Sequence, residues 1–357
     1  MSNQARLILL SGTGGSGTTT LVEASRAAAH DEGLRAVVVD AVHPALDDEF
    51  ARTVRDLAGV LVGWLDADDL PLEAWSCLLP VRQMAAWDQI ASALDQPQVD
   101  VVLVDCGSLR ESRALMEFAA TSRRLLDAAV TPSLAMRSQA APVGSSEVHF
   151  DVVSDLRDRL AAVVRLVESS RTTMRLVTVP EEAQVTRTLR AQAAFALLGV
   201  QVEAIILNRF ARKSEATGRS ALTAQEAQLE RAEQSSAGSW VWKSTSTLRP
   251  IPKDRSVAGP LGGVGVLRID DLEVMVEDEQ YSLVLPLVGD AARTACVGRA
   301  GDELVVEFDG LHRWLPLPAV LRRCHAVDAT RTGTSLVVSF VPDESLWRKA
   351  PEPEQVA

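Results

Sequence analysis

The sequence predicts an α/β fold with a mostly parallel β-sheet, followed by a small C-terminal all-β sandwich domain. Three observations lead to this prediction: short apolar runs that end at polar residues, helix-favouring segments between them, and alternating apolar and polar residues after about residue 255. Parallel strands joined by helices are typical of α/β domains, whereas alternation with a period of two is typical of antiparallel strands. We therefore expect two domains of different character.

The first unit of the parallel sheet is expected near the N-terminus. Leu7–Leu10 is an apolar run of the kind found in strands that are buried on both faces. Leu21–Glu32 is rich in alanine and favours a helix, which Gly33 suits as a C-terminal cap. Ala36–Val39 is then a second buried strand, which ends at Asp40. This order of strand, helix and strand predicts a parallel pair.

The same alternation continues along the chain, so the range 1–255 is expected to form the α/β domain. Pro180 suits the first turn of a helix, and the two glutamates that follow it suit the helix dipole. Thr223 and Glu226 have the spacing of a capping box at the start of a polar helix. Three further buried strands are expected, at 99–104, 175–179 and 202–207.

The C-terminal part of the chain has a different pattern. The stretch 256–278 is rich in glycine and acidic residues and is expected to be a linker. Short alternating segments separated by turn residues then predict a small β-sandwich over 279–347. The polar tail 348–357 is expected to be disordered. The alternating segments are Y-S-L-V-L-P-L, D-E-L-V-V-E-F, R-W-L-P-L-P and T-S-L-V-V-S-F.

Composition excludes several classes of protein. The chain has 357 residues, of which 47% are hydrophobic, and this is too many for a chain that is disordered throughout. Its net charge of −12 argues against a general binder of nucleic acid or of anionic membranes. The four cysteines lack zinc spacing and predict no disulfide framework. No signal peptide and no uncharged apolar run of ~18 residues are present, so we expect a cytoplasmic protein without an integral membrane segment.

A glycine-rich loop between the first strand and the first helix carries the most specific motif. Its spacing is that of G-x-x-x-x-G-K-[ST], in which backbone N–H groups and a helix N-terminus hold phosphates. Thr19 occupies the position whose hydroxyl ligates magnesium, and Thr18 occupies the position of the lysine, whose charge it cannot supply. The candidate nucleotide-binding residues of the loop are Gly12, Thr13, Gly14, Gly15, Ser16, Gly17, Thr18, Thr19 and Thr20.

The loop segment T-G-G-S-G-T-T resembles the K-G-G-x-G-K-[ST] loop of the ArsA-type ATPases, which include arsenite-pump ATPases and ATPases that target tail-anchored membrane proteins. Both lysines of that pattern are threonines here, Thr13 and Thr18. The first of these lysines reaches across a homodimer to the partner's nucleotide in that family. The resemblance therefore implies ATP and Mg²⁺ as cofactors, and a dimer whose nucleotide site is altered. Replacement of lysine by arginine across the chain, with 36 basic residues of which only four are lysine, does not explain threonine at these positions.

Further segments carry the same resemblance. V-V-L-V-D-C-G-S-L-R resembles the family's switch II and implies that Asp105 holds magnesium through water, with Ser108–Arg110 in place of the usual P-T-G. D-A-V-H resembles switch I and implies that Asp40 positions the attacking water. I-I-L-N-R-F resembles V-V-V-N-R-V and implies that Asn208 contacts adenine. The C-terminal segments resemble the α-crystallin-like domain of some bacterial members, so the expected fold is a P-loop NTPase fold with this sandwich attached.

These observations lead to one functional hypothesis and two alternatives. The hypothesis is a hydrolysis-impaired nucleotide-binding subunit, with Asp40 and Asp105 as catalytic-site residues and with Thr19 and Asp105 at the metal. It would act in a homodimer, or in a heterodimer with an active paralogue, in client or ion-linked handling. The alternatives are a slow but active ATPase of the anion-transporting or protein-targeting type, and a non-enzymatic chaperone-like binding module. Segments 64–87 and 116–136 would line a groove for a hydrophobic client, although core helices explain the same residues.

Overall fold

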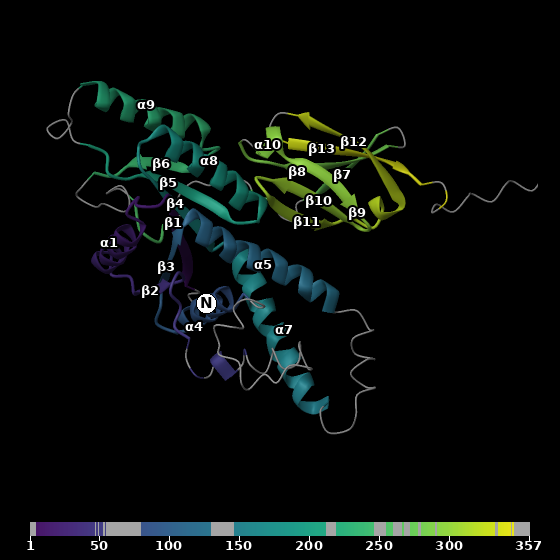
Figure 1. Ribbon diagram of the computed structural model, residues 1–357, viewed down its shortest axis with the longest axis horizontal. Coiled ribbons are helices and arrows are strands. Elements are labelled where there is room, and N and C mark those ends of the chain that lie inside the picture. The colour runs from purple at the N-terminus through teal and green to yellow at the C-terminus, as the bar shows by residue number, and fades with distance from the viewer. Residues whose placement is uncertain are drawn as a thin grey trace, which may run out of the picture.

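A six-stranded parallel β-sheet lies at the centre of the N-terminal part of the chain (Figure 1). Its strands lie in the order β2-β3-β1-β4-β5-β6. They are β1 (Arg6–Gly12), β2 (Ala36–Asp40), β3 (Val101–Ser108), β4 (Thr172–Thr178), β5 (Gln201–Leu207) and β6 (Trp240–Lys243). All pairings within this sheet are parallel, as expected for buried apolar strands joined by helices.

The computed structural model describes most, but not all, of the chain. The tryptophans at 64 and 75, the greater part of the expected client groove and the tail 348–357 lie outside the described residues. The described residues are 5–46, 48, 50–52, 54, 80–129, 146–211, 219–245, 255–259, 266–267, 272–277, 280–289, 291–332, 335–343 and 345.

Side chains of β1 alternate between two apolar cores, one on each face of the sheet. Ile8 and Leu10 pack against α1 (Thr18–Asp31), whose Leu21 is fully buried. Leu7 and Leu9 lie in the second core, which the remaining helices cover. None of the described helices is long and apolar enough to cross a membrane. The helices that cover this second core are α4 (Val81–Leu94), α5 (Leu109–Ala129), α7 (Ser146–Glu168), α8 (Glu182–Leu197) and α9 (Arg219–Ser235), while the short helix α10 (Ala291–Thr294) and a 3-10 helix at Leu321–Arg323 belong to the C-terminal part.

Three local predictions need correction. β3 does not end at residue 104 but continues to Ser108, because it pairs with β1 as far as Gly12. The capping box at Thr223 is wrong, since Thr223 lies inside α9 and its hydroxyl donates to the carbonyl oxygen of Arg219 at 3.0 Å. β6 was not predicted, because four residues at the edge of a sheet give too short a pattern to recognise.

The C-terminal part forms two antiparallel sheets that face each other, as the alternating segments predict (Figure 1). Apolar side chains alternate along the strands, and Leu285, Leu304, Val306, Leu336 and Phe340 are buried between the sheets. One sheet has the order β11-β10-β9, built from β9 (Cys296–Ala300), β10 (Glu303–Phe308) and β11 (Leu311–Pro316). The other has the order β12-β13-β8-β7, built from β7 (Glu273–Glu277), β8 (Gln280–Pro286), β12 (Cys324–Thr332) and β13 (Ser335–Pro342).

The first strand of this sandwich, β7, lies inside the stretch 256–278 that was expected to be a linker. It pairs with β8 over its whole length. Acidic residues flank its V-M-V run, and their charge obscured the strand pattern in the sequence. The expected linker is therefore not a free connection at this end.

The other end of that stretch is fixed to the α/β domain by a buried ionic cluster. Arg175 is fully buried in β4, with Nε 2.7 Å from Glu203 Oε1 and Nη2 donating to the carbonyl oxygen of Val257 at 2.7 Å. Arg6 also pairs with Glu203 and donates to the carbonyl oxygens of Ala258 and Gly259. One carboxylate thus holds two guanidinium groups, and these hold the segment 255–259 against the sheet.

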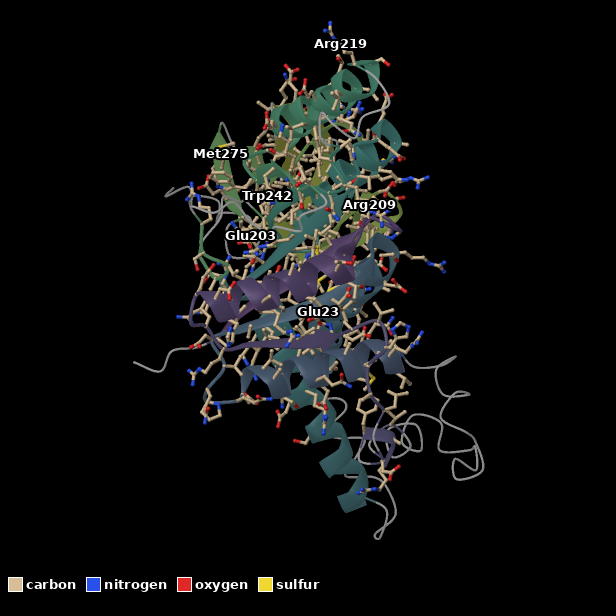
Figure 2. The ribbon with its side chains drawn as sticks, turned by 90° about the vertical axis from the view of Figure 1, so that its left-hand side faces the viewer. Glu23, Glu203, Arg209, Arg219, Trp242 and Met275 are labelled. Atoms are coloured by element: carbon tan, nitrogen blue, oxygen red, sulfur yellow. The ribbon has the colours of Figure 1, made fainter. Side chains whose placement is uncertain are left out.

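We expect Glu203→Gln to lower the free energy of unfolding by about 3–5 kcal/mol, because it leaves buried arginine charge without its counterion. Urea unfolding measures the change. Glu23→Gln is the matched control, since Glu23 pairs with Arg26 on the exposed face of α1, which faces the viewer in Figure 2. The control should change the free energy by less than about 1 kcal/mol. An equally small effect of Glu203→Gln would show that the cluster does not hold the fold together.

Candidate functional site

The loop between β1 and α1 presents a row of backbone donors at the carboxyl edge of the sheet. Gly15 and Gly17 have φ angles of 75° and 89°, in the left-handed region that glycine adopts readily. Gly17 is also the N-cap of α1, whose first turn contains no acidic residue. Successive N–H groups in such a conformation, at a helix N-terminus, form an anion-binding nest. The N–H groups of Gly14, Gly15, Gly17, Thr18 and Thr19 have no acceptor among the described residues.

Hydrogen bonds to two neighbouring strands, β4 and β5, hold the loop in place. The N–H of Thr13 donates to the carbonyl oxygen of Val177 in β4 at 3.0 Å. Asn208, directly after β5, is buried and donates from Nδ2 to the carbonyl oxygen of Ser16 at 2.8 Å. A Cβ atom on Gly17 would lie 2.7 Å from this Nδ2, so the brace requires glycine there. The loop therefore has its shape without help from a ligand.

Both threonines that replace lysine point into the protein. Thr18 is 9% exposed, and its hydroxyl lies 3.3 Å from that of Ser16. A Cβ atom on Gly12 would lie 2.5 Å from Thr18 Oγ1 and 2.3 Å from Ser16 Oγ, so the two hydroxyls pack against the bare Cα of Gly12. Thr13 is 5% exposed, and its Oγ1 has no hydrogen-bond partner among the described residues. The loop from Gly12 to Thr20 thus carries no cation of its own. Unlike Thr13 and Thr18, the next two threonines, Thr19 and Thr20, are exposed.

The two candidate catalytic aspartates lie side by side. Asp40 pairs in register with Asp105 between β2 and β3, and Asp105 is itself in register with Leu10, two residues before the loop. Asp105 is buried, and its Oδ1 accepts a hydrogen bond from the N–H of Gly107 at 2.9 Å. The structure therefore brings Asp40, Asp105 and the glycine-rich loop to one edge of the sheet.

Asp40 is engaged by its own loop. Its Oδ1 accepts hydrogen bonds from the N–H groups of Val42 at 2.9 Å and His43 at 3.0 Å. Its Oδ2 lies 3.3 Å from Nδ1 of His43, and the carboxylate is 54% exposed. These contacts turn the segment after β2 around the carboxylate.

A capping box that the sequence reasoning missed joins β3 to α5. Glu111 Oε2 accepts hydrogen bonds from the N–H and the hydroxyl of Ser108, both at 2.8 Å, and the N–H of Glu111 donates to Ser108 Oγ at 3.3 Å. The hydrogen bond from the Ser108 N–H holds the pKa of Glu111 below its usual value. The S-x-x-E spacing at 108–111 is the sequence signal that predicts such a box. Arg110 is exposed beside this box.

The space near the expected client groove is small in the described residues. Trp87 is 1% exposed, and its Nε1 donates to the carbonyl oxygen of Leu115 at 3.2 Å, so it is a core residue. The adjoining cavity has a volume of about 70 Å³ and is lined in part by Phe50, Met84 and Phe118.

Burial raises the pKa of the Cys106 thiol. No cluster of His, Cys, Asp and Glu that could hold a metal occurs among the described residues.

Comparison with known proteins supports the resemblance seen in the motifs. A family model described as anion-transporting ATPase matches residues 68–235, and one described as an HSP20-like domain found in ArsA matches 278–340. The chain is 24% identical to Protein Rv2184c of Mycobacterium tuberculosis over 76% of this chain and 70% of the relative. It is 23% identical to the uncharacterized protein SCO2128 of Streptomyces coelicolor over 96% of this chain and 99% of the relative.

The first matched region lies in the α/β domain and the second lies in the C-terminal sandwich. The first match covers β3, β4 and β5 of the parallel sheet with their helices, and the second covers β8 to β13 of the sandwich except for the last two residues of β13. The chain therefore matches the ArsA-type ATPase family over residues 68–235 and carries, over residues 278–340, an HSP20-like domain of the kind found in ArsA.

Proposed function

We propose that the chain binds the phosphates of a nucleotide at the β1–α1 loop without hydrolysing it efficiently, and that it acts as one subunit of a dimer. One observation carries the proposal: the backbone cradle is complete, while both threonines in the lysine positions are turned into the protein. The backbone N–H groups of the cradle donate hydrogen bonds to a phosphate, and the helix N-terminus adds partial positive charge. The missing lysine would have supplied a full charge to the β- and γ-phosphates.

The residues present fit ATP with Mg²⁺ in part. The free N–H groups of the loop would donate to phosphate oxygens, and the exposed hydroxyl of Thr19 would serve as a ligand for magnesium. The carboxylate of Asp105 would hold a water of the metal through Oδ2, since Oδ1 already accepts the Gly107 N–H. Asn208 would offer only Oδ1 to adenine, since its Nδ2 braces the loop. Bound magnesium would supply positive charge to the phosphates.

Binding survives the loss of lysine better than hydrolysis does. The loss of one charge-assisted hydrogen bond makes the free energy of nucleotide binding less favourable by about 1.5–3 kcal/mol. The transition state of phosphoryl transfer depends on positive charge around the transferred group, so losing that charge affects hydrolysis more. Oδ1 of Asp40 already accepts the N–H groups of Val42 and His43, so orienting a water would fall to Oδ2, which lies beside Nδ1 of His43.

The proposed dimer rests on the match to the ArsA-type ATPases. Two subunits face each other in this family, and the lysine at the position of Thr13 reaches the partner's nucleotide. The buried Thr13 cannot do so, which favours a heterodimer with a paralogue that keeps both lysines over a homodimer. The partner would supply the hydrolysis, and this chain would contribute its client-binding or ion-linked surface.

Thr18→Lys tests whether the cradle is intact. We expect it to raise the affinity for Mg-ATP about tenfold, because one charge-assisted hydrogen bond is worth roughly 1.5 kcal/mol. Isothermal titration calorimetry measures the change. Thr223→Lys adds the same charge on the exposed face of α9 and should leave the affinity unchanged. If the wild-type chain and Thr18→Lys both fail to bind, the loop is not a phosphate site and the chaperone-like binding module gains support.

Phosphate release tests the second half of the proposal. We expect phosphate release from ATP in the presence of the purified chain to be no faster than spontaneous hydrolysis in buffer without protein. Asp105→Asn should leave that rate unchanged, because the site lacks the cation that hydrolysis requires. A malachite-green assay measures the release. Turnover by the wild-type chain that Asp105→Asn abolishes would contradict the proposal and establish the slow ATPase instead.

A further inference from the structure

Among the described residues, two of the contacts between the HSP20-like sandwich and the α/β domain differ in chemistry. One contact is apolar and lies at the C-terminal end of α8, where Ala196 packs against Val288 and the N–H of Leu267 donates to the carbonyl oxygen of Ala196 at 3.1 Å. Leu198 and Leu267 are buried in the core that runs into the sandwich. We call these four residues the apolar anchor.

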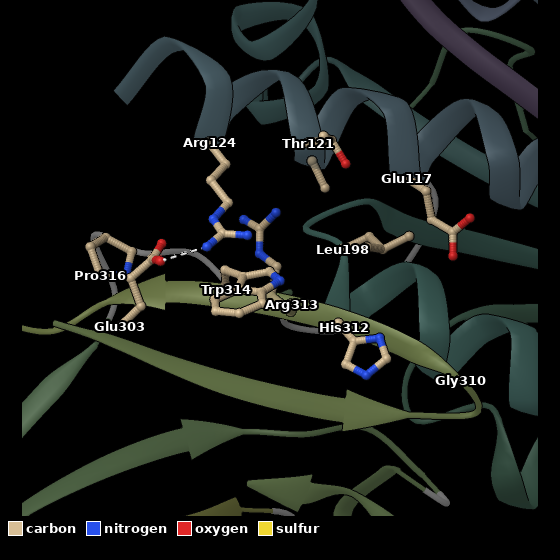
Figure 3. A pocket seen from close by; sticks show the side chains of 11 residues that line it. Glu117, Thr121, Arg124, Leu198, Glu303, Gly310, His312, Arg313, Trp314 and Pro316 are labelled. Atoms are coloured by element: carbon tan, nitrogen blue, oxygen red, sulfur yellow. Dashed lines mark hydrogen bonds and ion pairs between the residues drawn. The ribbon is translucent and has the colours of Figure 1, made fainter. Parts of the chain in front are cut away.

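The second contact is ionic and lies between α5 and the β10–β11 hairpin (Figure 3). Arg124 lies 3.1 Å from Glu303 and stacks 3.7 Å above the ring centre of Trp314. Asp309 lies at the hairpin turn. Its carbonyl oxygen accepts a hydrogen bond from Arg113 at 2.9 Å, and its Oδ1 accepts one from Arg190 of α8 at 2.7 Å. We call these residues the latch: Arg113, Arg124, Arg190, Glu303, Asp309 and Trp314.

The latch is loosely packed. A cavity of about 320 Å³ lies between α5 and the hairpin, and Arg124, Glu303 and Trp314 are among the residues that line it (Figure 3). The charged side chains of the latch are between 30% and 50% exposed. Exposed ion pairs are weak and are screened by salt. The turn itself is the two-residue Asp-Gly type that antiparallel hairpins favour, since Asp309 and Gly310 have φ angles of 54° and 73°. The latch can therefore open while the apolar anchor stays closed.

The other end of α5 is tied to the end of β1, directly before the glycine-rich loop. Ser112, in the first turn of α5, lies with its hydroxyl 2.7 Å from that of Ser11, the residue directly before the loop. The capping box of Ser108 and Glu111 fixes the helix to the end of β3 beside Asp105. The rise of ~1.5 Å per residue puts Arg124 about 18 Å along the helix from Ser112. One helix thus joins the end of β1, directly before the glycine-rich loop, to the latch.

We propose that α5 couples the phosphate loop to the HSP20-like sandwich, and that the latch is the separable contact through which the coupling acts. A shift of the β3–α5 junction moves the whole helix, and the latch then either follows or breaks, while the sandwich pivots on the apolar anchor. The coupling to nucleotide rests on the proposed function, whereas the mechanical link between the two ends of α5 does not.

Hydrogen–deuterium exchange of the full-length chain, read at the β10–β11 turn, tests the latch. Arg124→Glu and a rise in salt from 50 to 500 mM should each raise exchange at the turn by about two- to fivefold, the range expected for exposed ion pairs. The double variant Arg124→Glu, Glu303→Arg should restore it. Arg26→Glu on α1, which breaks an exposed pair outside the latch, is the control. Exchange that responds to neither salt nor charge reversal would overturn the latch.

Two buried serines of α5 test the link. Ser112→Ala removes the hydrogen bond to Ser11 and should raise exchange at the distant turn by about twofold. Ser122→Ala is the matched control, since Ser122 is equally buried, lies closer to the latch and bonds only within the helix, to the carbonyl oxygen of Phe118. If exchange at the β10–β11 turn is unchanged in Ser112→Ala, or changes equally in Ser112→Ala and Ser122→Ala, the proposed link is wrong.

The nucleotide arm separates this proposal from the proposed function. Mg-ATP should lower exchange at the turn of the wild-type chain, and Arg124→Glu should abolish this response. If calorimetry shows binding but exchange at the turn does not change, the coupling is wrong and the phosphate site stands. If calorimetry shows no binding, the proposed function fails, and the comparison of Ser112→Ala with Ser122→Ala still decides the link.

Discussion

The hydrogen bond from Asn208 Nδ2 to the carbonyl oxygen of Ser16 is the interaction on which the proposed site depends. It joins the end of β5 to the glycine-rich loop, while the bond from Thr13 to Val177 joins the loop to β4. Strands that are fully buried hold both acceptors and donors in place, so the sheet sets the shape of the loop. This is why the loss of two lysines need not collapse the cradle: neither charge contributes to the contacts that shape it.

The sequence predicted the fold well where its pattern was long and periodic. Strands near 7–10, 36–39 and 202–207 appear close to their expected limits, because a buried parallel strand leaves a continuous apolar run. β6 and β7 escaped prediction because one is four residues long and the other is flanked by acidic residues. The ionic cluster around Glu203 was also invisible, since its partners are far apart in sequence and only the fold brings them together.

The candidate site was predictable in its location but not in its details. The motifs named the loop, Asp40 and Asp105 as candidates, and the strand register brings them to one edge of the sheet. Their roles toward nucleotide stay predictions. The sequence could not show that Thr13 and Thr18 point inward, that Asp40 is held by its own loop, or that Glu111 caps α5, because each depends on side-chain packing. The contact between α5 and the sandwich likewise joins residues nearly two hundred positions apart.

The central claim is that the backbone of the loop is a working phosphate cradle. Selective ¹⁵N-glycine labelling and NMR titration of the full-length chain with Mg-ATP test it most directly, because the N–H groups of Gly14, Gly15 and Gly17 are themselves the proposed donors. The account predicts that these three resonances shift together on binding, while those of Gly298 and Gly301 in the sandwich, away from the loop, serve as internal references. Loop resonances that stay unchanged at millimolar nucleotide would contradict it.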